Sequence, residues 1–193
     1  MRAIRKDILP ATIAVLVFTL LCGLAYPLLV TGVSQVLFSG KANGSLVEQN
    51  GKVVGSRLIG QDFSERRDLF QSRPSVTGYN PAATFFNNRG PNQATLSVQQ
   101  HRFALDYAAR EGISLAKVPA DAATTSASGV DPNISEQNAR IQSVRVARET
   151  GIPRARVLQL IGEHTDGRGL GVFGEPGVNV LELNLAIDKE SRR

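Results

Sequence analysis

The sequence has very few side chains that could cross-link the chain or bind a metal ion. Its single cysteine, Cys22, lies inside an uncharged N-terminal stretch, so the rest of the chain can form no internal disulfide. The only two histidines, His101 and His164, are far apart and lack the spacing of metal ligands. We therefore predict no metal site, and a domain whose stability comes from its apolar core.

Familiar catalytic and nucleic-acid-binding patterns are also missing. The formal net charge is +5, but the arginines are scattered rather than clustered with aromatic residues, which argues against nucleic-acid binding. There is no Walker A motif, nucleophile elbow or His-Glu-x-x-His motif. Gly167–Gly171 (GRGLG) is glycine-rich like a phosphate loop, but neither Lys-Ser nor Lys-Thr follows it. The sequence therefore predicts no catalytic residues and no tightly bound cofactor.

The N-terminal stretch has the length of a membrane span. No charged residue occurs from Ile8 to Gly40. Residues 8–33 alone would form a helix of about 39 Å, and the hydrocarbon core of a bilayer is about 30 Å thick. A cleaved signal peptide is the alternative, but its apolar part usually has only ~7 to 15 residues and ends at a small-residue cleavage site. We predict a retained transmembrane helix.

Basic residues at the start of the chain predict the orientation of this helix. Arg2, Arg5 and Lys6 precede the span, and basic residues favour the cytoplasmic side. We expect residues 1–7 in the cytoplasm, residues 8–33 in the membrane, residues 34–44 as a juncture, and residues 45–193 as a soluble domain outside the bacterial inner membrane.

Proline and glycine mark special positions within the span. Pro27 is expected to kink or end the helix, because it has no N–H to donate to the preceding turn. Gly23 and Gly32 are candidate contact positions for a partner helix, since small residues let two helices approach closely.

The soluble part has the pattern of a small α+β domain. Residues 45–59 predict a β-hairpin turning at Asn50-Gly51, and residues 60–91 predict an aromatic, turn-rich loop. We expect helices over 92–111, from Asp131 or Ser135 to about 150, and from Pro153 onward. Residues 178–185 predict a buried C-terminal strand. The expected architecture is one transmembrane helix followed by a mixed α/β domain, with the hairpin and C-terminal strand packed on about three helices.

One polar segment of the soluble domain is the candidate binding site. Ser126, Ser128, Gly129 and Asp131 belong to a stretch of small and hydroxyl residues that leads toward the second predicted helix. Unpaired N–H groups at a helix N-terminus favour an anion, so these four residues are candidates for cofactor binding. Alternatively, the hydroxyls cap turns and helix ends.

Five segments together with the N-terminal span carry a family resemblance over nearly the whole chain. They are 37–46 (LFSGKANGSL), 55–61 (GSRLIGQ), 73–75 (RPS), 118–132 (VPADAATTSASGVDP) and 174–181 (GEPGVNVL). On these segments the chain resembles the C subunit of the bacterial Kdp potassium-transporting P-type ATPase. It departs from the family pattern at Asn133, where a histidine is expected, and at Phe85–Arg89, where the family has Gly-Ser-Asn-Leu.

The resemblance implies a role in a larger complex. In that family a channel-like A subunit binds potassium, a B subunit hydrolyses ATP, and a small F subunit completes the assembly. The C subunit is described as a catalytic chaperone that raises the ATP affinity of the B subunit, with ATP held in a ternary complex. ATP is cytosolic and the domain is expected outside, so direct contact with nucleotide stays open. The alternative function is that of an anchored extracytoplasmic binding protein or hydrolase.

Overall fold

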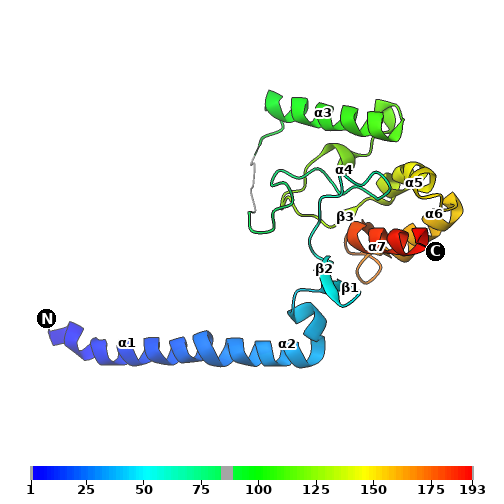
Figure 1. The fold of residues 1–193 in the computed structure, drawn as a ribbon. Coiled ribbons are helices and arrows are strands. Elements are labelled where there is room, and N and C mark those ends of the chain that lie inside the picture. Colours follow the sequence, from blue (N-terminus) through cyan, green and yellow to red (C-terminus); the bar gives the residue numbers. More distant parts are fainter. Residues whose placement is uncertain (1, 84–88, 193) are drawn as a thin grey trace. The chain divides into compact units, whose positions relative to one another are not determined.

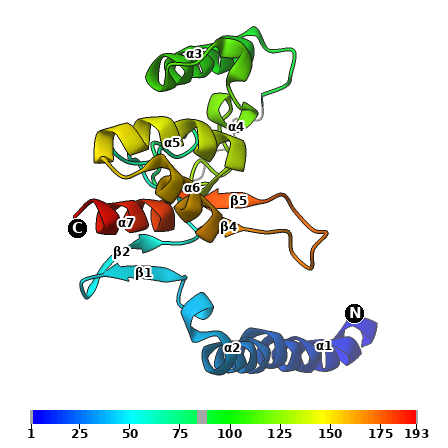
Figure 2. The same cartoon turned by 90° about the vertical axis from the view of Figure 1, so that its right-hand side faces the viewer.

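The structure is a computed structural model that describes residues 2–83 and 89–192, with side chains described from Lys6 onward. The chain forms two compact units, residues 1–46 and residues 47–193. The helices α1 to α7 and strands β1 to β3 are labelled in Figure 1, and strands β4 and β5 are labelled in Figure 2.

The first unit is a long apolar helix that contains one turn of π-helix. It consists of α1 (Arg2–Leu20), the π turn η1 (Leu21–Ala25) and α2 (Tyr26–Ala42). The backbone N–H of Tyr26 donates to Leu21 O, five residues back. The π turn ends two residues before Pro27, which has no N–H to donate. The helix therefore continues beyond Pro27 rather than ending there.

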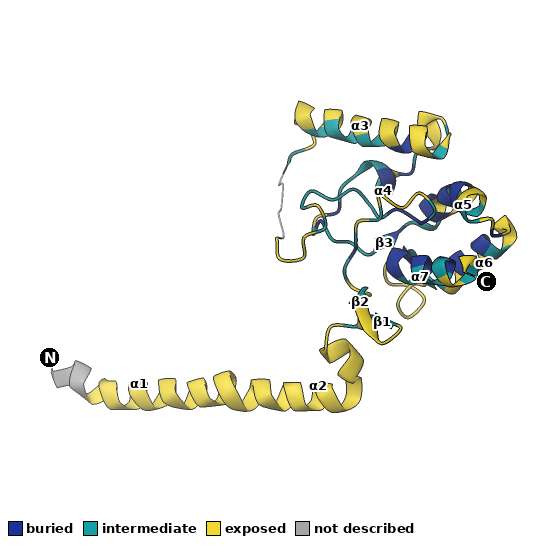
Figure 3. Cartoon of the chain, in the orientation of Figure 1, coloured by how far each residue is buried: buried dark blue, intermediate teal, exposed yellow. Residues whose placement is uncertain are grey.

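This helix is long and apolar enough to cross a membrane. The stretch Lys6–Ala42 has 37 residues and a mean hydropathy of 2.5 over its most apolar window, none of which is buried. Figure 3 colours the described residues of α1 and α2 almost uniformly as exposed. Helical structure extends beyond Val33 as far as Ala42, with a local break at Phe38, where φ is −141° and ψ is 40°. Side chains so apolar and so exposed are suited to contact with lipid or with other helices.

A β-hairpin follows, with the predicted turn. Strands β1 (Leu46–Gln49) and β2 (Lys52–Ser56) are joined by Asn50 and Gly51. Both turn residues have positive φ, 53° and 72°. Two such residues in succession allow the tight connection for which Asn-Gly is favoured. The predicted hairpin is confirmed.

The second unit contains helices around a small antiparallel sheet. The helices are α3 (Ala94–Glu111), α4 (Ala120–Ala123), α5 (Glu136–Thr150), α6 (Arg154–Glu163) and α7 (Val180–Ser191), with a 3-10 turn η2 (Leu115–Lys117). The sheet has the order β3-β5-β4, formed by Asn133–Ile134, Gly177–Asn179 and Thr165–Asp166. Its central residue Val178 pairs with Ile134 on one side and Thr165 on the other. The predicted α+β class is confirmed.

Local capping explains where α5 begins and where α3 and α5 end. Ser135 Oγ accepts a hydrogen bond from Asn138 N, which satisfies a first-turn amide of α5. Gly112 and Gly151 end α3 and α5 with φ of 67° and 74°. All three predicted helices are confirmed, although α3 and α6 begin without a side-chain cap.

The predicted C-terminal strand over residues 178–185 is wrong beyond Asn179. Only Gly177–Asn179 is extended, and α7 begins at Val180. Asn179 Oδ1 accepts from Glu182 N, so Asn179 is a helix cap. The deeply buried Val180, Leu183 and Ile187 lie on one face of α7 at helical spacing. The apolar run was therefore the start of a helix.

The core lies among α5, α6, α7 and the β5 strand, which pack on one another. Figure 1 shows the three helices together, and Figure 2 shows β5 beside them. The predicted aromatic loop contributes to it through Leu69 and Phe70. Phe70 N donates to Asn184 Oδ1 at 2.8 Å, and Asn184 Nδ2 donates to Phe70 O at 2.9 Å. This reciprocal pair fixes the loop to α7. Phe85 and Phe86 of the same predicted loop lie outside the described residues.

Candidate functional site

The four predicted cofactor-binding residues lie together on the loop between α4 and β3, and their polar atoms bond within the chain. Ser126 Oγ accepts from Gly129 N at 3.0 Å, and Ser128 Oγ accepts from Val130 N at 3.2 Å. The Asp131 carboxylate accepts from Asn133 N at 3.0 Å. These are the bonds of side chains that cap turns. An anion-binding role for the four residues stays a prediction.

Residues 60–79 pack against this loop and hold it in place. Gly60 N donates to Val130 O at 2.7 Å, and Ser75 Oγ donates to Gly129 O at 2.5 Å. Arg73 Nη1 donates to Asp131 Oδ2 at 2.8 Å. A β-carbon on Gly60 would overlap the carbonyl of Asp131, so the two backbones approach more closely than any other residue allows.

The N-terminus of α5 is occupied by a carboxylate of the chain itself. Asp121, on α4, accepts from Ser135 N at 2.8 Å, from Ser135 Oγ at 2.9 Å and from Asn138 Nδ2 at 2.9 Å. Negative charge is stabilised at this end of a helix by the unpaired amides and the helix dipole. Asp121 therefore places a negative charge of the chain itself beside this helix end.

A cavity of about 200 Å³ lies between residues 62–79 and helices α3, α4 and α5. Its walls include Asp62, Tyr79, Asp106, Tyr107 and Arg110. Burial raises the pKa of Tyr79 to about 12, and the nearby negative charge of Asp62 adds to this increase. None of the four predicted residues lines this cavity.

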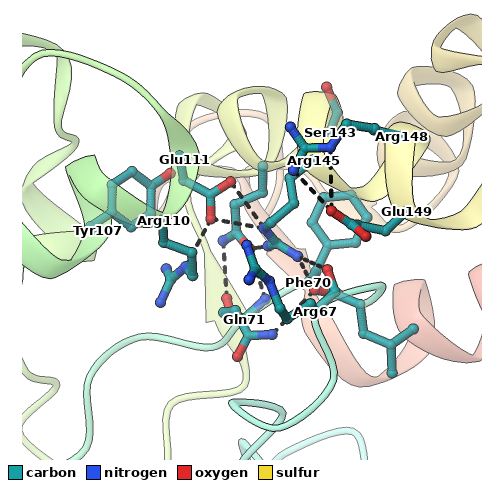
Figure 4. A network of polar contacts seen from close by, with 12 residues as sticks. Arg67, Phe70, Gln71, Tyr107, Arg110, Glu111, Ser143, Arg145, Arg148 and Glu149 are labelled. Carbon is teal, nitrogen blue, oxygen red and sulfur yellow. Dashed lines mark hydrogen bonds and ion pairs between the residues drawn. The ribbon is translucent and has the colours of Figure 1, made fainter.

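The wall formed by α5 belongs to a buried polar network, shown in Figure 4. The Arg145 guanidinium bonds Glu111 at 3.1 Å, and both side chains are almost fully buried. It also donates to Leu69 O at 2.9 Å, to Arg67 O, and to Gln142 Oε1 at 2.9 Å. Burial lowers the pKa of Arg145, while the Glu111 charge opposes that shift.

This network joins three parts of the domain through one side chain. Glu111 ends α3, Arg145 lies in α5, and the two carbonyls belong to the loop before Phe70. Sequence reasoning missed it. Asn138, Gln142 and Arg145 recur at i, i+4 and i+7, which puts three long polar side chains on one buried face of α5. That polar stripe was the available signal.

Metal-binding groups are not assembled in the described part of the chain. Among residues 2–83 and 89–192, no three His, Cys, Asp or Glu side chains lie close enough to hold a metal ion. The two histidines are in α3 and immediately after α6.

The predicted helix-contact positions are open on the first unit. A β-carbon added at Gly32 would meet no atom within 4 Å, and one at Gly23 would only touch Thr19 at 4.0 Å. Larger residues would therefore fit within the isolated helix. Contact with a partner helix at either position stays a prediction.

These features define a class of protein: a compact α+β domain that follows a helix able to span a membrane. The family model described as K+-transporting ATPase, c chain, matches residues 8–189. The chain belongs to this family of potassium-transporting ATPase subunits.

Individual relatives match along almost their full length. The potassium-transporting ATPase KdpC subunit of Mycobacterium tuberculosis is 45% identical over 188 residues, 96% of this chain and 99% of the relative. The KdpC subunit of Geobacter sulfurreducens is 45% identical over 188 residues, covering 95% and 97%. That of Koribacter versatilis is 43% identical over 187 residues, covering 95% of each. The family resemblance inferred from the sequence is confirmed.

Proposed function

We propose that this chain is a non-catalytic accessory subunit of an ATP-driven, high-affinity potassium uptake complex. In this proposal it assembles with the potassium-binding A subunit, the ATP-hydrolysing B subunit and the F subunit. The observation that carries the proposal is the family match over residues 8–189, which includes both the apolar helix and the α+β domain. The bonding of the predicted site residues within the chain further supports a structural role for that loop.

Assembly is tested by copurification. The full-length chain, carrying an affinity tag and expressed with the other ATPase subunits of its own organism, should retain the A and B subunits in detergent. Recovery of the tagged chain alone, with potassium-limited growth normal in its absence, would count against the proposal.

We further propose that the chain raises the affinity of the B subunit for ATP and stabilises the assembly, with ATP held in a ternary complex. The Michaelis constant for ATP should then be higher in the complex prepared without this chain, and addition of the chain should lower it again. An unchanged constant would refute the chaperone role while leaving membership of the complex intact.

The proposed orientation has the N-terminus in the cytoplasm and the domain outside the cell membrane. It is supported by Arg2, Arg5 and Lys6 before the span. In a Cys22→Ser background, an impermeant maleimide should label Lys52→Cys on intact cells and Lys6→Cys only after permeabilisation. Both lysines are exposed in the structure, so accessibility within the chain does not bias the comparison. The opposite labelling pattern would invert the topology.

A further inference from the structure

The connection between β4 and β5 carries an exposed apolar tip. Leu170 is 92% exposed, Val172 68% and Phe173 67%. Figure 2 shows this connection extending beyond its two strands. Among the large apolar side chains in the described part of the chain, Leu170 is the most exposed. Apolar side chains gathered on an exposed surface commonly mark an interaction site.

The tip is held in a defined shape. Gly169 N donates to Phe173 O at 2.7 Å, and Phe173 N donates back to Gly169 O at 2.9 Å. Gly171 N donates to Arg168 O at 3.0 Å, and Gly171 has a φ of 79°. The tip is therefore a tight hairpin end. A partner that binds it does not have to order a flexible loop first.

The identity of residue 170 is not explained by folding. Leu170 has a φ of 51°, in the left-handed region that glycine and asparagine adopt more readily than leucine. It has almost no packing within the chain. Because leucine here favours neither the backbone conformation nor contact with water, its apolar side chain is best explained by contact with another molecule.

The charges at the base of the tip favour a protein over a lipid surface. Arg168 Nη2 lies 3.0 Å from Glu175 Oε2, and residues 169–174 carry no charge. Loops that bind anionic membranes usually add unpaired basic residues to their apolar side chains. This tip has none. The other subunits of the ATPase share its membrane and therefore meet it at high effective concentration.

We propose that Leu170, Val172 and Phe173 insert into an apolar pocket on the surface of another subunit of the same ATPase. The inference rests on the proposed function. Three side chains are too few to supply the ~800 Å² that each partner contributes to a standard interface. The tip is therefore one anchor within a wider contact.

Photo-cross-linking identifies what touches the tip. The photoreactive amino acid p-benzoylphenylalanine is placed at position 172 of the full-length chain, which is expressed with the other ATPase subunits and irradiated in intact membranes. Position 58 is the matched control, because Leu58 is 61% exposed outside the tip. We expect a covalent adduct with one ATPase subunit, identified by mass spectrometry, from position 172 and none from position 58. A lipid adduct alone, or no protein adduct, would overturn the inference.

A second experiment separates docking from folding. The double variant Leu170→Asn/Phe173→Ser should unfold at the same temperature as the wild type or higher, since asparagine suits the left-handed backbone. We expect about tenfold less of the partner subunits to copurify with it. A lower unfolding temperature with unchanged copurification would indicate a purely structural tip. If the wild-type chain also fails to copurify with the other subunits, the proposed function fails as well. If the wild type and the double variant copurify equally well with them, only the inference about the tip fails.

Discussion

Replacing Arg145 with methionine tests whether the buried network is what holds α3, α5 and the loop before Phe70 together. Removal of one partner from a buried ion pair typically costs about 3 to 5 kcal/mol. In this variant the Glu111 carboxylate would still accept from Arg110 Nε at 2.8 Å, so the buried charge of Glu111 would retain one partner. The carbonyls of Arg67 and Leu69 would each lose the guanidinium donor. We therefore expect a cost near the lower limit, about 3 kcal/mol.

The assay is thermal unfolding of the full-length chain in detergent. For a domain of this size, 1 kcal/mol shifts the midpoint by roughly 2 to 4 °C, so Arg145→Met should lower it by roughly 10 °C. The control is Arg140→Met on the same helix. The Arg140 side chain is 60% exposed and forms an ion pair with Glu136 of the same helix, and such a pair contributes about 0.5 kcal/mol or less. Equal decreases in the unfolding midpoint for the two variants would refute the idea that Arg145 holds α3, α5 and the loop before Phe70 together.

A double-mutant cycle adds a second criterion. Glu111→Gln alone should also destabilise, because it leaves the Arg145 charge buried beside a neutral amide. Combined with Arg145→Met, its effect should be clearly less than additive, because the two groups contact each other directly. Strict additivity would mean that the ion pair contributes nothing beyond its separate hydrogen bonds.

Three further predictions follow from the loop and the membrane helix. Gly60→Ala should destabilise the chain by about 1 to 3 kcal/mol, because the added β-carbon would overlap the Asp131 carbonyl. The control Gly90→Ala, whose β-carbon would enter open space, should leave the midpoint of the same thermal unfolding assay unchanged. Since the folded-state pKa of Tyr79 is raised from 10.0 to about 12, its contribution to stability is complete below pH 10 and is lost as the pH rises toward 12. The free energy of unfolding of Tyr79→Phe should therefore fall less steeply than that of the wild type between pH 10 and pH 12. An equally steep fall would contradict the burial of the Tyr79 hydroxyl. Gly23→Leu should reduce copurification with the other subunits while Gly23→Ala preserves it; equal recovery of both variants would exclude close helix packing there.

Local sequence signals determined much of what the structure contains. The uncharged stretch after Asp7 predicted the apolar helix because charged side chains are too costly in a bilayer. Asn50-Gly51 predicted its turn because both residues tolerate positive φ. Gly112 and Gly151 marked helix ends for the same reason. Each of these features depends on residues close together in the chain.

Tertiary structure decided the features that depend on distant residues. A short apolar run after Gly177 suited a strand as well as a helix, and packing of Val180, Leu183 and Ile187 in the core favoured the helix. Asp121 was an unremarked acidic residue until the fold brought it to the N-terminus of α5. The ion pair between Glu111 and Arg145 joins positions 34 residues apart, and no local pattern specifies which charges meet in a core.

The sequence by itself therefore determined the long apolar helix, the α+β class and the ATPase subunit family, because apolar length, turn chemistry and family motifs depend on contiguous residues. Only the tertiary structure decided that the predicted serines bond within their own loop, that Arg145 is the central joint of the domain, and that Leu170, Val172 and Phe173 project together from a rigid hairpin. Those features arise from burial and close approach, which depend on the whole chain being folded.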